Sequence, residues 1–371
     1  MNYQGEALSL FLELAGIPSP PGEERAVADV VLRYLGGLGI EADEDGCGPA
    51  IGSSIGNIYV RLEPTVSGTP LFFCAHLDTV PPSGPLEPVV DGGVVRNAGG
   101  TILGADNKSA VVAMLEGVRR VLAENRPHAG IELVFTPKEE VGLIGAGAFD
   151  HDRLLARVGY VYDHAGPVGE IILGAPWSYG LEVTFHGRAA HSGMFPEEGR
   201  SAIQAAAKAI ADLRLGRVDE ETTANVGLIT GGTARNIVPE WCTFQAEARS
   251  QDERKLNELV QEMLDAFSFA ATAVDCEVEA ESRRSYVGYR FKRDEEAVQL
   301  AAAALGRCGF EPSYGFSGGG ADANVFNERG RRCVNLADGM ADIHTPDEHI
   351  AVDDLEAMVD VTLALVDAAR A

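Results

Sequence analysis

The stretch Leu71–Asp78, LFFCAHLD, is an apolar run of strand length that ends in a histidine and an aspartate. Carboxylates also follow the apolar runs in LVFTPKEE and VGYVYDHAG. Burying an unpaired carboxylate is costly, so such residues directly after buried strands are unusual in a protein built only for packing. With an aspartate in ILGADNKS and a histidine in DIHTPDEH, they indicate a metal site and metal-assisted hydrolysis. The positions are His76, Asp78, Asp106, Glu139, Glu140, Asp163 and His344.

Around this stretch, the first half of the chain alternates between strand-like and helical patterns. Short unbroken apolar strands between helices are typical of a mostly parallel α/β sheet covered on both faces. Ligands of such sheets gather at the carboxyl ends of the strands, where the acidic and histidine positions lie. The expected strands are Ile55–Leu62, Leu71–His76, Ile131–Thr136 and Val158–Tyr162, and the expected helices are Glu23–Leu38 and Asn107–Ala123.

The pattern changes after Gly174-Ala175-Pro176 to the order β-α-β-β-α-β, which is that of the ferredoxin-like split βαβ unit. We therefore expect an inserted α+β domain over residues 176–286, between two parts of a discontinuous catalytic domain at 1–175 and 287–371. The inserted strands are expected at Tyr179–His186, Ala224–Thr230, Trp241–Ala248 and Ala273–Ala280, and its helices at Ser201–Leu213 and Asp252–Phe267. Helices return near Asp294–Gly306 and Asp353–Ala369.

Composition narrows the class of protein. The chain has 371 residues, 46% hydrophobic and 23% charged, which is ordinary for a soluble globular protein of two domains. Its net charge of −26 repels nucleic acid and anionic membranes, and no run approaches the ~18 apolar residues of a membrane span. The opening MNYQGEALSLFLELAG has acidic residues in its apolar stretch and predicts an amphipathic helix, not a signal peptide. Six scattered cysteines without a CxxC pattern favour reduced thiols in a cytoplasmic protein.

The residue types at the strand ends suit a catalytic metal centre. In an extended chain His76 and Asp78 point the same way, so Asp78 can accept a hydrogen bond from the imidazole while the other ring nitrogen binds metal. Asp106 opens a predicted helix and could cap it, bridge two metals, or do both. Neighbours in an extended loop face different ways, so Glu140 can bind metal while Glu139 acts as a general base.

Taken together, the motifs resemble the co-catalytic di-zinc exopeptidase superfamily that includes peptidase T, carboxypeptidase G, aminoacylase and succinyl-diaminopimelate desuccinylase. The resemblance spans essentially the whole chain and is strongest to the peptidase T-like branch. The motifs that carry it are AHLDTVPP, TILGADNKSAV, FTPKEEVGLIGA, YDHAGPVG, GRAAHSG, RNIVP and HTPDE.

The resemblance implies a role for each position. One zinc ion would be held by His76 and Asp163 and the other by Glu140 and His344, with Asp106 bridging them and Asp78 orienting His76. Glu139 would be the base, and the peptide bond between Asp106 and Asn107 would be cis. Three residues of the inserted domain would act on the substrate. His191 would reach the active site of a partner subunit and stabilise the oxyanion, and Asn236 and Arg249 would contact the substrate backbone or carboxylate.

Two other classes of function are weighed against this one. Gly315–Gly319, GFSGG, fits the G-x-S-x-G pattern of a serine hydrolase with Ser317 as nucleophile, followed by an aspartate and His344. That motif needs a buried strand before the serine and a helix after it, whereas EPSY precedes it here and further glycines follow. A non-catalytic metal-binding protein is the second class, and the presence of Glu139 with all five ligand positions disfavours it.

The sequence therefore predicts a cytoplasmic, zinc-dependent exopeptidase that acts on short peptides, as a homodimer joined through residues 176–286. An aminopeptidase is favoured, and a carboxypeptidase or an N-acyl amino acid deacylase on the same two-zinc core is the open alternative. Co²⁺ or Mn²⁺ could replace Zn²⁺, because carboxylates and imidazoles suit several divalent ions.

Overall fold

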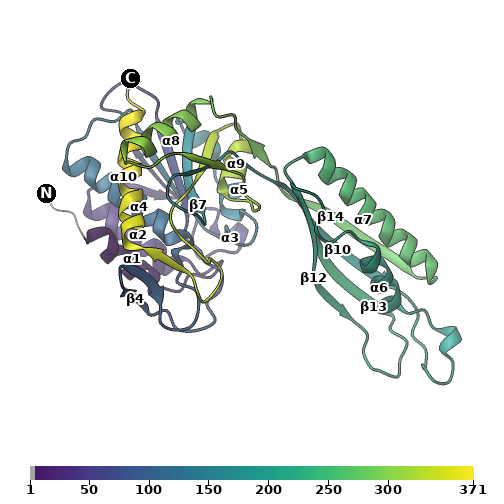
Figure 1. Cartoon of the computed structure of the whole chain (residues 1–371). Helices are drawn as coiled ribbons and strands as arrows, with labels where there is room; N and C mark the ends of the chain where they lie inside the picture. The colour runs from purple at the N-terminus through teal and green to yellow at the C-terminus, as the bar shows by residue number, and fades with distance from the viewer. Residues whose placement is uncertain (1–4) are drawn as a thin grey trace. The chain divides into compact units, whose positions relative to one another are not determined.

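The computed structural model describes residues 5–371, which form two units (Figure 1). The first unit comprises the chain up to Ala175 together with Arg290–Ala371, and the second is Pro176–Tyr289. The expected boundary at residue 286 is the last residue of a strand, and the second unit extends beyond it to Tyr289.

The first unit is built on a mixed sheet whose middle strands are parallel. Its strand order is β1-β2-β6-β3-β7-β17-β8-β16, and β6, β3, β7 and β17 run in the same direction. Every residue of β3 and β6 is buried, which accounts for their unbroken apolar sequences. The strands are β1 Ala42–Glu44, β2 Ile58–Leu62, β3 Leu71–His76, β6 Ile131–Thr136, β7 Val158–His164, β8 Glu170–Ile172, β16 Ser313–Gly315 and β17 Arg332–Ala337.

Helices cover this sheet and carry the connections between its strands. Helix α4 packs against β3 and β7, α8 packs against β7 and β17, and α10 packs against both helices. The Asp106 end of α4 therefore lies next to β3, which ends in His76, and next to β7, which carries Asp163. The helices of this unit are α1 Glu6–Ala15, α2 Arg25–Gly37, α3 Gly48–Ile51, α4 Ala105–Ala123, α5 Ile144–Ala148, α8 Glu296–Arg307, α9 Asp322–Glu328 and α10 Val352–Ala368, with a 3₁₀ turn at His151–Arg153.

A small antiparallel sheet, in the order β18-β5-β4, was not expected from the sequence. It pairs β18, His349–Ala351, with β5, Val94–Asn97, and β5 with β4, Pro88–Asp91. These strands are three or four residues long, too short to show a clear alternation of apolar and polar residues. The pairing brings the chain around His344 beside the loop that leads into α4. Two short strands, β9 Gly174–Ala175 and β15 Tyr289–Arg290, pair separately.

The second unit has the predicted split βαβ arrangement. Its antiparallel sheet has the order β11-β12-β13-β10-β14, and the side chains of Phe185, Phe244 and Phe267 meet in its core. Its elements are β10 Trp177–His186, α6 Ala202–Asp212, β11 Gly216–Arg217, β12 Thr222–Gly231, β13 Trp241–Ser250, α7 Glu253–Ala273 and β14 Glu277–Tyr286, with a 3₁₀ turn at Pro196–Glu198.

The predicted boundary between the last helix and strand of this unit was wrong. Helix α7 continues past Phe267 to Ala273, and β14 begins only at Glu277. The extra helical turns, SFAATA, contain good helix formers, and Ala270 and Ala271 are buried in the core of the unit. Among residues 5–371, no helix is long and apolar enough to cross a membrane.

Candidate metal centre

The parallel strands deliver the predicted ligands to one edge of the sheet of the first unit. His76 is the last residue of β3, Glu140 follows β6, and Asp163 lies at the end of β7. His344 comes from the loop between β17 and β18. The ligand atoms of His76, Asp106 and Glu140 all lie within 4.8 Å of one another. The five positions proposed to bind metal therefore converge, as expected for strands whose carboxyl ends share one edge.

Asp106 lies between the two imidazoles. Its Oδ1 is 3.0 Å from His76 Nε2, and its Oδ2 is 3.2 Å from His344 Nε2. The two histidines have further carboxylate neighbours: His76 Nε2 is 3.7 Å from Asp163 Oδ1, and His344 Nε2 is 3.1 Å from Glu140 Oε1. The donors thus fall into two groups, one at each oxygen of the Asp106 carboxylate.

Asp106 does not cap the helix that it helps to open. Gly104 occupies the cap position, and the backbone angles of Asp106 and Asn107 are not helical. The Asp106 carboxylate contacts histidines instead, so the capping role is not seen. The Asp106–Asn107 peptide bond is cis.

Asp78 is oriented differently from the expectation based on an extended chain. Strand β3 ends at His76, so Asp78 lies beyond it, and His76 Nδ1 is 2.8 Å from the Asp78 carbonyl oxygen. The Asp78 carboxylate is 3.6 Å from the imidazole and accepts hydrogen bonds from the backbone N–H groups of Glu139, at 2.9 Å, and Glu140, at 3.1 Å. Asp78 therefore fixes the backbone of the glutamate pair.

A carboxylate that the sequence interpretation did not single out supports the Asp106 loop. Glu348 is buried, and its Oε1 accepts a hydrogen bond from the backbone N–H of Asp106 at 3.0 Å. Its Oε2 accepts from the N–H groups of Leu103, at 2.7 Å, and Gly104, at 2.8 Å. Glu348 ends the motif HTPDE, but its distance in sequence from Leu103 left no local pattern to reveal this contact.

Burial and mutual contact shift the pKa values of the cluster strongly. Burial, with Asp163 and other carboxylates nearby, raises the pKa of Glu139 well above its usual value. Burial likewise raises the pKa of Asp163 to about 7. Hydrogen bonds to Asp106 and Glu140 raise the pKa of His344 to about 10. For His76 burial lowers the pKa, but the hydrogen bond to Asp106 and the nearby carboxylates of Asp163 and Asp78 outweigh it, and the net shift is strongly upward.

Burial raises the pKa of the two acids, and the excess of negative charge in the buried cluster favours a higher pKa at all four groups. The carboxylates favour the protonated imidazoles, so the cluster as a whole favours added positive charge. Imidazole nitrogens and carboxylate oxygens are ligands of Zn²⁺ and of other divalent ions, and two such ions would supply that charge. The donor set therefore fits metal ions. His344 has 46% of its side chain exposed, so the cluster is also open to solvent on one side.

The three predicted substrate residues lie in the second unit. His191 and Asn236 are in loops that pair with each other, since Ser192 N–H donates to the Asn236 carbonyl at 3.1 Å. Both side chains are exposed. Arg249 is at the far end of β13, which begins at Trp241, and it donates to Glu247 Oε2 at 2.8 Å. Within the second unit, Arg249 is therefore separated from His191 and Asn236 by about 26 Å of strand.

Ser317, the nucleophile of the serine-hydrolase alternative, donates its hydroxyl hydrogen bond to the Gly319 carbonyl at 3.0 Å. The histidine of that alternative, His344, contacts Asp106 and Glu140 in the cluster described above.

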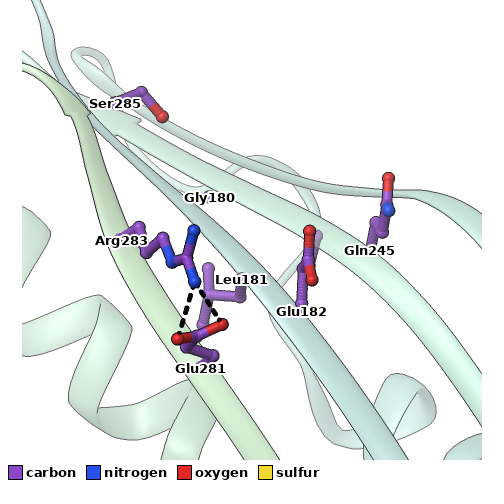
Figure 2. A pocket seen from close by; sticks show the side chains of 8 residues that line it. Gly180, Leu181, Glu182, Gln245, Glu281, Arg283 and Ser285 are labelled. Atoms are coloured by element: carbon purple, nitrogen blue, oxygen red, sulfur yellow. Dashed lines mark hydrogen bonds and ion pairs between the residues drawn. The ribbon is translucent and has the colours of Figure 1, made fainter.

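Figure 2 shows a hollow on the sheet of the second unit, where both carboxylate oxygens of Glu281 accept from Arg283 Nη2 at 2.9 Å. That guanidinium is already paired, so we assign no ligand to the hollow. Its lining is Gly180, Leu181, Glu182, Gln245, Ala246, Glu281, Arg283 and Ser285.

Comparison with known proteins agrees with this division of the chain. Residues 57–174 match peptidase family M28, and residues 178–274 match the peptidase dimerisation domain of family M20. YqjE of Bacillus subtilis, an uncharacterised protein, is 39% identical over 369 residues and 100% of both chains. The crystal structure of aminopeptidase PepT from Bacillus cereus is 37% identical, with a TM-score of 0.90 over 99% of this chain and 98% of that one. A tripeptidase from Staphylococcus aureus is 34% identical, with a TM-score of 0.93 over the same shares.

The fold, the buried donor cluster and these similarities define a metallo-exopeptidase. Within that class, the chain belongs to the peptidase T-like branch of the M20 peptidase family.

Proposed function

We propose that the protein is a two-zinc aminopeptidase that removes the first residue from short peptides. The observation that carries the proposal is the position of Asp106, whose two carboxylate oxygens face different imidazoles at 3.0 and 3.2 Å. His76 and Asp163 would hold one ion, and Glu140 and His344 the other. The similarity to an aminopeptidase and to a tripeptidase supports a free peptide as substrate.

The ions would supply Lewis acidity, which polarises the scissile carbonyl and lowers the pKa of water to about 7. Glu139 then takes a proton from the attacking water and delivers it to the leaving amine. Its side chain is buried, and its backbone N–H is held by Asp78, so the carboxylate has a fixed starting position. Burial and the neighbouring carboxylates raise its pKa, which favours its holding the proton between the two transfers.

The substrate is tested by incubating zinc-loaded enzyme with a free tripeptide and with its N-acetylated twin, and following both by mass spectrometry. Cleavage of the free peptide alone, with release of its first residue, supports the aminopeptidase. Cleavage of the acetylated peptide alone would instead assign a carboxypeptidase or a deacylase to the same metal centre.

The role of Glu139 is tested separately with Glu139→Gln and Glu139→Ala. Neither change removes one of the five proposed metal ligands, so both variants should bind zinc like the wild type. Loss of the general base should lower kcat by about 10²- to 10⁴-fold. Zinc content is measured by mass spectrometry and turnover on the tripeptide, and turnover retained by both variants would contradict the mechanism.

The proposal includes a homodimer formed through the second unit, in which His191 stabilises the oxyanion in the partner's active site. The match to a dimerisation domain supports the homodimer. The separation of His191 from Arg249 along β13 also supports it, because two residues so far apart within one unit would more readily act on the active sites of different subunits. Mixing the inactive Glu139→Gln and His191→Ala variants provides the test. Mixed dimers should regain part of the wild-type activity if His191 acts across the dimer, and no gain would contradict that assignment.

A further inference from the structure

Glu348 is a buried carboxylate that the proposed reaction does not use. The residue is 1% exposed, and its two oxygens accept hydrogen bonds from the backbone N–H groups of Leu103, Gly104 and Asp106 at 2.7 to 3.0 Å. One side chain thus satisfies three donors of a single short loop. Hydrogen bonds to an ionised acceptor are among the stronger ones in proteins.

These hydrogen bonds join the two chain segments that carry Asp106 and His344. Glu348 follows His344 in the motif HTPDE, and the next residue begins β18, which pairs with β5. The loop on the other side leads directly to Asp106. The distance of 3.2 Å between His344 Nε2 and Asp106 Oδ2 therefore depends on segments that Glu348 holds together.

The Asp106 loop has a conformation that needs such support. Gly104 has φ +78°, and Asp106 has φ −79° and ψ 100°, so the chain departs from helical geometry where α4 begins. Leu103 and Ala105 are fully buried, so the N–H groups of this loop have little access to water. Without the Glu348 carboxylate, the loop would have to move to find other acceptors, and Asp106 would move with it.

We propose that Glu348 is a positioning residue of the metal centre, which fixes the Asp106 carboxylate relative to His344 so that the two can bind the same ion. This inference rests on the proposed function, because it takes Asp106 and His344 as ligands. It predicts that the charge and the length of this side chain control metal affinity, although Glu348 itself is not a ligand.

The variant that tests this is Glu348→Gln, because an amide offers one acceptor oxygen and directs its NH₂ group at backbone donors. Removing such a supporting partner of a metal ligand lowers metal affinity by about 10- to 100-fold. Zn²⁺ affinity is measured by competition with a chromophoric chelator, and ligand geometry by the visible absorption of the Co²⁺-loaded protein. We expect weaker Zn²⁺ binding and an altered Co²⁺ spectrum.

Glu132 provides a matched control. It is 3% exposed, and it accepts from the N–H groups of Leu155 and Ala156 and from the Tyr59 hydroxyl. It lies near the start of β6, at the opposite end of that strand from Glu140. Glu132→Gln should lower thermal stability and leave Zn²⁺ affinity and the Co²⁺ spectrum unchanged. If Glu348→Gln behaves in the same way, Glu348 is structural only and the proposal is overturned.

A second variant keeps the test decisive if Glu348→Gln does not fold. Glu348→Asp retains the charge but is shorter, so it should bind Zn²⁺ more weakly than the wild type. Wild-type affinity and spectrum in Glu348→Asp would overturn the proposal. Failure of the wild-type protein to bind Zn²⁺ would instead refute the proposed function, so the two failures are distinguishable.

Discussion

Replacing Asp78 should destabilise the first unit by an amount that its hydrogen bonds set. Its carboxylate accepts from the N–H groups of Glu139 and Glu140, and the residue is fully buried. Asp78→Asn keeps one acceptor oxygen, so one donor loses its partner, whereas Asp78→Ala removes both. At about 1.5–3 kcal/mol for a hydrogen bond to a charged group, the expected losses are about 1.5–3 kcal/mol for Asp78→Asn and about 3–6 kcal/mol for Asp78→Ala.

The assay is urea unfolding of the metal-free protein, followed by two signals. Both tryptophans, Trp177 and Trp241, belong to the second unit, so their fluorescence reports that unit, while far-ultraviolet circular dichroism reports both. Unfolding of the first unit is therefore the part of the circular dichroism change that the fluorescence change does not accompany. The Asp78 variants should lower the urea midpoint of that transition and leave the slope of its unfolding free energy against urea concentration unchanged.

Asp322→Asn is a control for the change from carboxylate to amide. Asp322 is equally buried, but only its Oδ2 accepts hydrogen bonds, and among the described residues its Oδ1 has no partner. The amide should therefore be tolerated better there than at Asp78. Equal costs at the two positions, or a loss below about 0.5 kcal/mol for Asp78→Asn, would refute the reasoning.

Two further predictions concern stability elsewhere in the first unit. In Gly159→Ala the new Cβ would lie 2.2 Å from the Phe72 ring, and such overpacking should cost about 1–3 kcal/mol, measured by the same circular dichroism transition. Burial lowers the pKa of His128, so its neutral form contributes stability that is present above its unfolded pKa of about 6.5 and is lost as the pH falls below it. His128→Leu should therefore reduce the fall in melting temperature between about pH 7 and about pH 5, which lie on either side of the unperturbed histidine pKa. A fall equal to that of the wild type would contradict this prediction.

The central strands of the first unit could be predicted because local sequence determines them. Residues Ile131–Thr136 and Leu71–His76 are strands with the predicted limits, since each is an unbroken apolar run in the middle of a covered sheet. The convergence of His76, Asp163 and Glu140 then follows from parallel strands sharing one carboxyl edge. The split βαβ arrangement of the second unit likewise follows from the order of its elements.

Contacts between distant segments could not be predicted in this way. Glu348 meets Leu103 across 245 positions of sequence, and no periodicity records such a contact. The orientation of Asp78 differs from the prediction because strand β3 ends at His76, so Asp78 does not follow the alternation of an extended chain. The limit of helix α7 depended on burial of Ala270 and Ala271 against the sheet, which apolar spacing alone does not distinguish from the start of a strand.

The discontinuity of the first unit has a consequence for how the chain is made on the ribosome. Strand β17 pairs with β7, yet residues 165–331 separate them, so β7 keeps an open edge until the whole inserted unit has been synthesised. The inserted unit has its own core and completes its elements earlier, so it can fold first. An open edge strand that is apolar over Val158–Tyr162 is a site of misassociation during this interval. Synthesis of this chain therefore passes through a stage that favours early chaperone contact with β7, well before His344 has emerged.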